Sequence, residues 1–181
     1  MFEKRVHSVE RRYLPEFVYG ASDGVVTTFA IVTGAIGASL SPSVILILGF
    51  ANLFADGFSM ATSNYLSTKS EVDLLRSKKH ESSSLKHPLK AAIATYFSFI
   101  AIGFIPLISF VLASFNNSIA AHRFTYSFIL TGLALLLIGS VKGYVVKKHF
   151  LRSALQTLII GGIAALLAFG VGFLLKNIIV G

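Results

Sequence analysis

Five apolar runs account for most of the chain, and short polar segments separate them. Each run reaches about the 20 residues that an α-helix needs to cross a bilayer at 1.5 Å per residue. The pattern therefore predicts membrane-spanning helices at about 17–38, 43–66, 89–113, 124–144 and 154–175. Since no second domain separates them, we expect one all-α integral membrane domain over 1–181, with 67–87 as a short cytoplasmic loop.

The prolines agree with these boundaries. Pro15, Pro42 and Pro88 each stand at the start of a run, where the missing N–H costs nothing. Pro106 lies inside the third run, which predicts a kink there.

Glycines recur at helical spacing in two of the runs. Gly20-x-x-x-Gly24 lies in the first run, and Gly139-x-x-x-Gly143 ends the fourth. Such spacing lets helices approach closely. The sequence alone leaves open whether this happens within one protomer or across a dimer.

Charged residues are few, and their positions predict an orientation. They make up 13% of the chain, against 54% apolar residues and a mean hydropathy of +0.75. Fourteen of the sixteen basic residues fall on one side of a five-span arrangement, and only Arg123 and Lys176 fall opposite. The positive-inside rule then places the N-terminus in the cytoplasm. Orientation explains the net charge of +8 without nucleic-acid binding.

Enzyme chemistry finds little support. The absence of cysteine excludes thiolate metal sites and cysteine nucleophiles. His80-Glu81 lacks the second histidine of a zincin, and neither a GxSxG motif nor a phosphate loop occurs. We expect a protein that is not an enzyme and holds no tightly bound cofactor.

Two carboxylates fall within the predicted spans. Asp23 lies in the first, and Asp56 lies in the second within a polar and thioether stripe at a spacing of four: Asn52, Asp56, Met60 and Asn64. Intramembrane acids are costly and usually face a pathway or a partner. Counting from the turn near 39–41 puts Asp23 level with Asp56 and Met60, in the cytoplasmic half. Carboxylates with a thioether favour Fe²⁺ or Mn²⁺ over Mg²⁺ and Ca²⁺.

Structural roles are the alternative for each of these residues. An intramembrane Asp can pair with a lysine, and Lys142 is the nearest candidate. Met60 alone would be ordinary packing, and Asn52 and Asn64 alone would bridge helices by hydrogen bonds. Their shared helix face favours the metal site.

Two stretches resemble the vacuolar iron transporter family. They are DGVVTTFAIVTGAIGASLS (Asp23–Ser41) and the motif Ala-Asp-Gly-x-Ser-Met that ends at Met60; the last span is also similar. The resemblance implies a five-helix protomer, a homodimer with the pathway at its interface, and Fe²⁺ or Mn²⁺ leaving the cytoplasm against protons. It also implies that Asp23 and Met60 line that pathway.

This chain departs from the family pattern in two places. The plant vacuolar and fungal members carry Glu where this chain has Asn52, and we infer that Asp56, one turn on, takes over the acid role with Asn52 as a neutral ligand. The plant vacuolar members also insert a cytoplasmic metal-binding domain between spans two and three. The connection here is too short for it, and its acids and histidines (Glu71, Asp73, His80, Glu81 and His87) are expected to be solvated.

The leading hypothesis is a homodimeric divalent metal transporter that exports Fe²⁺ or Mn²⁺ by exchange with protons. The short connection is typical of the nodulin-like and prokaryotic branch, so we expect a prokaryotic cytoplasmic membrane, or a vacuolar membrane in a eukaryote. Two alternatives stay open: a proton-coupled exporter of small organic cations, and a non-transporting membrane scaffold.

Overall fold

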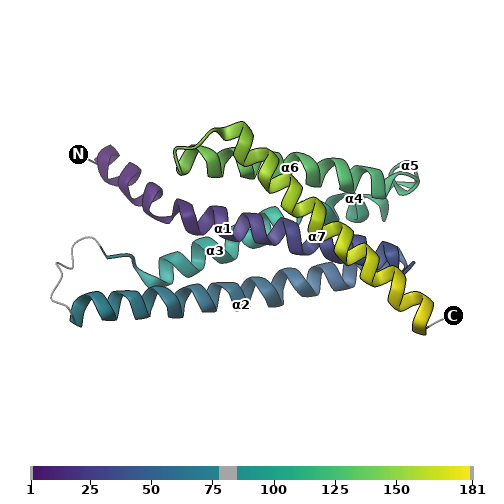
Figure 1. The fold of residues 1–181 in the computed structure, drawn as a ribbon, viewed down its shortest axis with the longest axis horizontal. Coiled ribbons are helices and arrows are strands. Elements are labelled where there is room, and N and C mark those ends of the chain that lie inside the picture. Colours follow the sequence, from purple (N-terminus) through teal and green to yellow (C-terminus); the bar gives the residue numbers. More distant parts are fainter. Residues whose placement is uncertain (1, 78–84, 180–181) are drawn as a thin grey trace.

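The computed structural model describes residues 2–77 and 85–179, with side chains from residue 13 onward. Within these ranges the chain forms helices and short turns without strands (Figure 1). The helices are α1 (Phe2–Gly37), α2 (Pro42–Ser77), α3 (Pro88–Gly103), α4 (Ile105–Ala113), α5 (Asn117–Ala120), α6 (Arg123–Val145) and α7 (Phe150–Ile179).

Among the described residues, four helices are long and apolar enough to cross a membrane: Tyr13–Gly37 of α1, α2, α6 and α7. The pair α3 and α4 meets the same criteria together, which makes five spans when the pair counts as one. The chain is thus an all-α integral membrane protein, and each predicted span has its counterpart.

The predicted kink in the third span is confirmed. The axes of α3 and α4 differ by 44° across Phe104, two residues before Pro106. Pro106 has no N–H to donate to the preceding turn, so the regular hydrogen-bond ladder is interrupted there. Ser127 on α6 donates a hydrogen bond of 2.7 Å to the carbonyl oxygen of Pro106, which ties the bend to its neighbour.

Two helices continue beyond the predicted apolar runs. α2 runs to Ser77, so 67–77 of the predicted loop is helical, with Thr68 and Val72 still buried. α1 begins at Phe2 and passes through Pro15, so the prediction that Pro15 starts its helix was wrong. Hydropathy marks where lipid contact ends, whereas a helix continues as long as its residues favour it. His80 and Glu81 lie outside the described residues.

α1 is the central helix of the bundle. Two clusters of buried apolar side chains meet on it. One joins Val32 to residues of α2, α3 and α4, such as Leu53, Phe99 and Leu107. The other joins Val25 to α6. α3 packs against both α1 and α2, and α7 crosses α1 and α6 (Figure 1).

The glycine motifs serve contacts within the protomer. A Cβ on Gly24 would lie 3.0 Å from Cα of Phe99 and closer still to its carbonyl oxygen, and Gly20 faces Thr95 in the same way. α1 and α3 are therefore in backbone contact. A Cβ on Gly139 would lie 2.6 Å from Cα of Ala154, so α6 and α7 are equally close.

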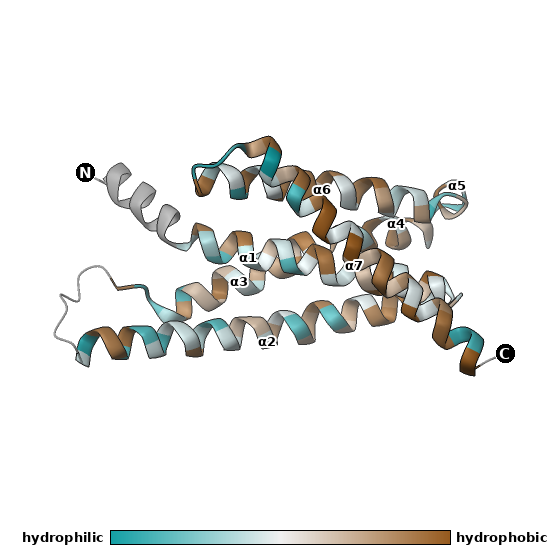
Figure 2. Ribbon diagram, in the orientation of Figure 1, coloured by the Kyte–Doolittle hydropathy of each residue, from teal (hydrophilic) through white to brown (hydrophobic). Residues whose placement is uncertain are grey.

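The basic segments meet at one end of the bundle. The start of α1, the end of α2 and the turn between α6 and α7 lie together, opposite α5 and the C-terminus (Figure 1). Colouring by hydropathy shows α7 as apolar along most of its length, whereas α2 carries polar patches in its middle (Figure 2). The middle of α2 is where the sequence predicts a metal site.

Candidate metal site between α1 and α2

The predicted stripe runs along the edge of the packed face of α2. Asn52, Asp56, Met60 and Asn64 are all half-buried. The residue that follows each of the first three is buried in the bundle: Leu53, Gly57 and Ala61. The stripe therefore lies where the packed face of α2 turns toward the surface of the protomer.

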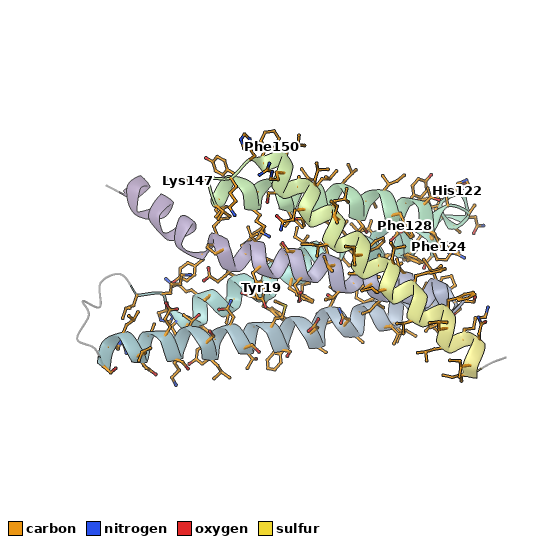
Figure 3. The ribbon with its side chains drawn as sticks, viewed as in Figure 1. Tyr19, His122, Phe124, Phe128, Lys147 and Phe150 are labelled. Carbon is orange, nitrogen blue, oxygen red and sulfur yellow. The ribbon has the colours of Figure 1, made fainter. Side chains whose placement is uncertain are left out.

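A groove of about 390 Å³ opens beside this stripe. α2 contributes Met60 and Asn64 to its lining, together with three serines, and α1 contributes Tyr19. Figure 3 shows Tyr19 projecting from α1 toward α2. The aromatic ring from α1 and the thioether from α2 thus line the same opening.

The same register puts Asp23 beside Asp56. α1 and α2 are antiparallel, so one turn forward from Tyr19 on α1 corresponds to one turn back from Met60 on α2. Asp23 is one turn after Tyr19, and Asp56 is one turn before Met60. The two carboxylates are close enough to interact electrostatically.

Neither carboxylate has a partner within the described residues. No ion pair or hydrogen bond reaches the carboxylate oxygens of Asp23 or Asp56 there, although Thr27 donates to the backbone carbonyl of Asp23, and the ion pair found in that part of the chain joins Lys86 to Glu16. Lys142, the suggested partner, lines a different cavity at the turn between α6 and α7. The structural alternative, an Asp paired with a lysine, therefore finds no support among the described residues.

Asn64 is used inside the protomer. Its amide nitrogen donates a hydrogen bond of 2.6 Å to Oγ1 of Thr95 on α3. Its amide oxygen accepts one of 3.1 Å from Oγ1 of Thr68. These bonds link α2 to α3, which is the structural alternative for this residue, and leave little of the carboxamide free for an ion.

Asn52 and Met60 are placed differently. The side-chain nitrogen of Asn52 is buried without a hydrogen-bond partner. Amide nitrogen and oxygen are assigned from the hydrogen-bond network, and no network fixes them here, so the oxygen can equally take that position. Met60 packs against the buried cluster of α1, α2, α3 and α4 and also lines the groove. Asn52 and Met60 thus each keep an atom free that could bind a metal ion, the carboxamide oxygen and the thioether sulfur.

One protomer by itself offers few ligands. The described residues contain no group of three or more His, Cys, Asp or Glu side chains placed to hold a metal ion. The site of one chain comprises two carboxylates, one thioether and one carboxamide. An ion that prefers six ligands needs further donors from water or from another chain.

The structure adds two features that the sequence reading missed. Tyr19 lines the groove one turn from Asp23, and its i, i+4 spacing to Asp23 was a usable signal. Small exposed residues also follow one another at a spacing of four along α2, next to the polar stripe: Ala51, Ala55, Ser59, Ser63 and Ser67. Such a row lets another helix approach the groove closely.

Comparison with known proteins identifies the family. A sequence model of the VIT family matches residues 14–86 and 73–173. The chain belongs to the VIT family. This family is a transporter family and not an enzyme class, in agreement with the missing enzyme motifs.

Curated relatives cover most of the VIT-family chain at low identity. A protein named vacuolar iron transporter from Plasmodium berghei is 27% identical over 94% of this chain and 85% of its own length. Vacuolar iron transporter 1 from Eucalyptus grandis is 26% identical over 92% of this chain and 88% of its own. Vacuolar iron transporter homolog 4 from Arabidopsis thaliana is 29% identical over 91% of this chain and 84% of its own.

The alignment lengths distinguish two kinds of relative. The alignment with the Plasmodium berghei protein is 234 positions long, although 94% of this 181-residue chain is only about 170 residues. That relative thus carries some 60 residues that this chain lacks. The alignment with homolog 4 is 171 positions long and needs no such insertion. This agrees with the prediction of a short family member without an inserted domain.

Proposed function

We propose that this protein is a homodimeric transporter that moves Fe²⁺ or Mn²⁺ out of the cytoplasm in exchange for protons. The observation that carries the proposal is the juxtaposition of the unpaired carboxylates of Asp23 and Asp56 beside a groove walled by Met60. Two relatives that bear the name vacuolar iron transporter agree with metal as the cargo.

The donor atoms favour these two ions. Carboxylate and carboxamide oxygens alone would suit Mg²⁺ or Ca²⁺. The thioether of Met60 adds a softer donor that those ions bind poorly and that Fe²⁺ tolerates better. In our proposal Asp23, Asp56 and Met60 hold the ion, Asn52 is a neutral ligand, and Asn64 positions α2 against α3.

The place of the groove supports the dimer in this proposal. In a lone protomer the half-buried acids beside the groove would border lipid, where a charged side chain costs about 2.5–3.5 kcal/mol on insertion scales. A second copy seated on the small-residue row of α2 would cover them. It would also double the carboxylates from two to four, which supplies the ligands that one chain lacks.

Proton exchange would supply energy for export. Moving two positive charges outward against 100 mV costs about 4.6 kcal/mol, at 2.3 kcal/mol per charge. Returning protons that neutralise the carboxylates after metal release offset that charge and reset the site. The expected orientation places the basic end of the bundle in the cytoplasm, either of a prokaryote or, with a vacuolar membrane, of a eukaryote.

The direct test is uptake of Fe²⁺ and Mn²⁺ by proteoliposomes that contain a pH dye. Wild type is expected to take up metal with alkalinisation of the lumen. Asp23→Asn is expected to lose both signals, and Met60→Leu, which keeps the packing but removes the sulfur, is expected to slow metal entry. Asp73→Asn is the matched control, because Asp73 is exposed near the end of α2, away from the groove.

Each alternative outcome has a distinct meaning. Metal entry without a pH change would refute proton exchange and leave the acids as ligands of a uniporter. Wild-type metal transport by folded Asp23→Asn would refute the site. Transport of organic cations but not of metal would refute the metal proposal and make the protein an exporter of organic cations.

A further inference from the structure

We propose that the turn between α6 and α7 binds an anionic phospholipid. A cavity of about 560 Å³ at this turn is lined by five residues with basic side chains. They are Lys142, Lys147, Lys148, His149 and Arg152. Basic pockets between membrane helices at the interface are suited to anionic lipid headgroups. This proposal is independent of the metal-transport function.

No side chain that the structure describes neutralises the charge of this cavity. None of its five basic side chains makes an ion pair or a side-chain hydrogen bond within the described residues. All eight acidic residues of the chain lie in its first 81 positions, so α6 and α7 contain none. The cations of this turn therefore have no acidic residue on their own helices, whereas Lys69 and Arg76 have Glu71 and Asp73 on theirs.

An apolar surface continues directly from the basic cavity. His149, Arg152 and Gln156 line both the cavity and a second crevice whose other walls include Leu155, Ile159 and Ile160. On α7 the positions 152, 155, 156, 159 and 160 share one face, which extends about 12 Å into the span at 1.5 Å per residue. A phosphate with an attached acyl chain fits this combination, whereas a free phosphate uses only the basic half.

The backbone keeps the lysines at this position. Lys147 has a φ of 53°, in the left-handed region where glycine is the usual residue at the end of a helix. The N–H of Lys148 donates to the carbonyl oxygen of Gly143 over 2.9 Å and closes the turn. Figure 3 shows Lys147 and Phe150 together at this turn, at the far end of the bundle from His122.

The chain contains no tryptophan, which provides a direct test. Leu155→Trp introduces one fluorophore into the crevice, and acyl chains brominated on phosphatidylglycerol or on phosphatidylcholine quench it on contact. At equal mole fractions we expect brominated phosphatidylglycerol to occupy the site roughly fivefold better or more, the factor that one interfacial Lys or Arg contributes. Phe97→Trp on the exposed face of α3 serves as reporter control and is expected to show no such preference.

Charge removal then assigns the preference to the cavity. Lys147→Gln, Lys148→Gln and Arg152→Gln together should remove most of it, because Lys142 is then the one lysine or arginine left in the cavity lining. Unchanged quenching by brominated phosphatidylcholine is the proof that the segment still lies in the bilayer. Lys69→Gln, Arg76→Gln and Lys90→Gln remove as many charges from the end of α2 and the start of α3, which lie at the same end of the bundle, and should retain it.

Three results would overturn the proposal. The first is equal quenching by the two brominated lipids at Leu155→Trp. The second is a preference that persists undiminished after the loss of the three cavity charges, or that both triple variants lower equally, since it would then reflect the general positive charge of this end. The third is displacement of the brominated lipid by millimolar inorganic phosphate, which would make the cavity a free-phosphate site.

Discussion

Replacing Gly24 by alanine should destabilise the protein, although alanine favours helices. The new Cβ would lie 3.0 Å from Cα of Phe99 and closer still to its carbonyl oxygen. These are backbone atoms of α3, so no side-chain rotation can relieve the contact. α1 and α3 must instead move apart, at the point where Gly103 of α3 also packs on the backbone of Gly24.

The magnitude follows from two opposing effects. Overpacking typically costs about 1–3 kcal/mol, and a contact with rigid backbone belongs at the upper end of that range. The higher helix propensity of alanine returns about 1 kcal/mol. The net loss is about 2 kcal/mol, which for a chain of this size lowers Tm by roughly 4–8 °C.

Gly132→Ala is the matched control. Gly132 lies in α6, and a Cβ there would meet no heavy atom within 4 Å. Helix propensity then acts alone, so this variant should be up to about 1 kcal/mol more stable than wild type. Both variants and wild type are compared by thermal unfolding in the same detergent. A Gly24→Ala protein as stable as the Gly132→Ala protein would refute the contact between α1 and α3.

Three further predictions test other contacts. Lys86→Met should destabilise the protein more than Lys90→Met in the same thermal assay. Glu16 is only 8% exposed and would lose the cation of Lys86, whereas Lys90 has no acidic partner among the described residues. Equal Tm values of the two variants would contradict this. Asn64→Ala should lower the stability by about 1 kcal/mol, because Thr95 and Thr68 lose their hydrogen-bond partner, yet this variant should transport metal faster than Asp23→Asn. A complete loss of transport by folded Asn64→Ala would instead mean that Asn64 is a ligand of the ion. Asp56→Asn should abolish metal uptake by proteoliposomes. Adding Asn52→Glu to this variant restores the family carboxylate one turn away and should recover part of the uptake. No recovery would mean that the acid must stand at position 56.

The spans were predictable because hydropathy follows lipid contact. Five apolar runs gave the helices, and Pro106 gave the bend between α3 and α4. The ends were less accessible, since polar residues that leave the bilayer can remain helical, as 67–77 of α2 does with Val72 still buried. A proline within a helix was also mistaken for its start, because Pro15 interrupts the apolar pattern without interrupting α1.

The sequence predicted which positions along α1 and α2 belong to the candidate site, but not which neighbouring helix each side chain would contact. Spacing placed Asn52, Asp56, Met60 and Asn64 on one face of α2, and counting from the turn matched Asp23 in depth. Spacing could not tell which members of the stripe α3 would use. That depends on the close contact of α3 with both helices, which brings Thr95 to Asn64, whereas Met60 lines the groove.

The same contact gives a physical reason for a dimer. The glycines at 20 and 24 bring α3 against one side of α1, and Gly57 brings it against α2, so the bundle occupies the inner side of both helices. Tyr19 and Met60 line the groove between these helices, an unpaired acid lies one turn from each of them along the chain, and a row of small residues follows α2. A face with acids is expensive toward lipid, and a face with small residues is well suited to a second helix. We therefore expect dissociation of the proposed dimer to abolish metal binding together with transport. Ser59→Trp puts a large ring on the small-residue row of α2. We expect this variant to elute as a monomer in size-exclusion chromatography and no longer to bind Fe²⁺ or Mn²⁺. A monomeric Ser59→Trp protein with full metal affinity would instead mean that one protomer holds the ion by itself.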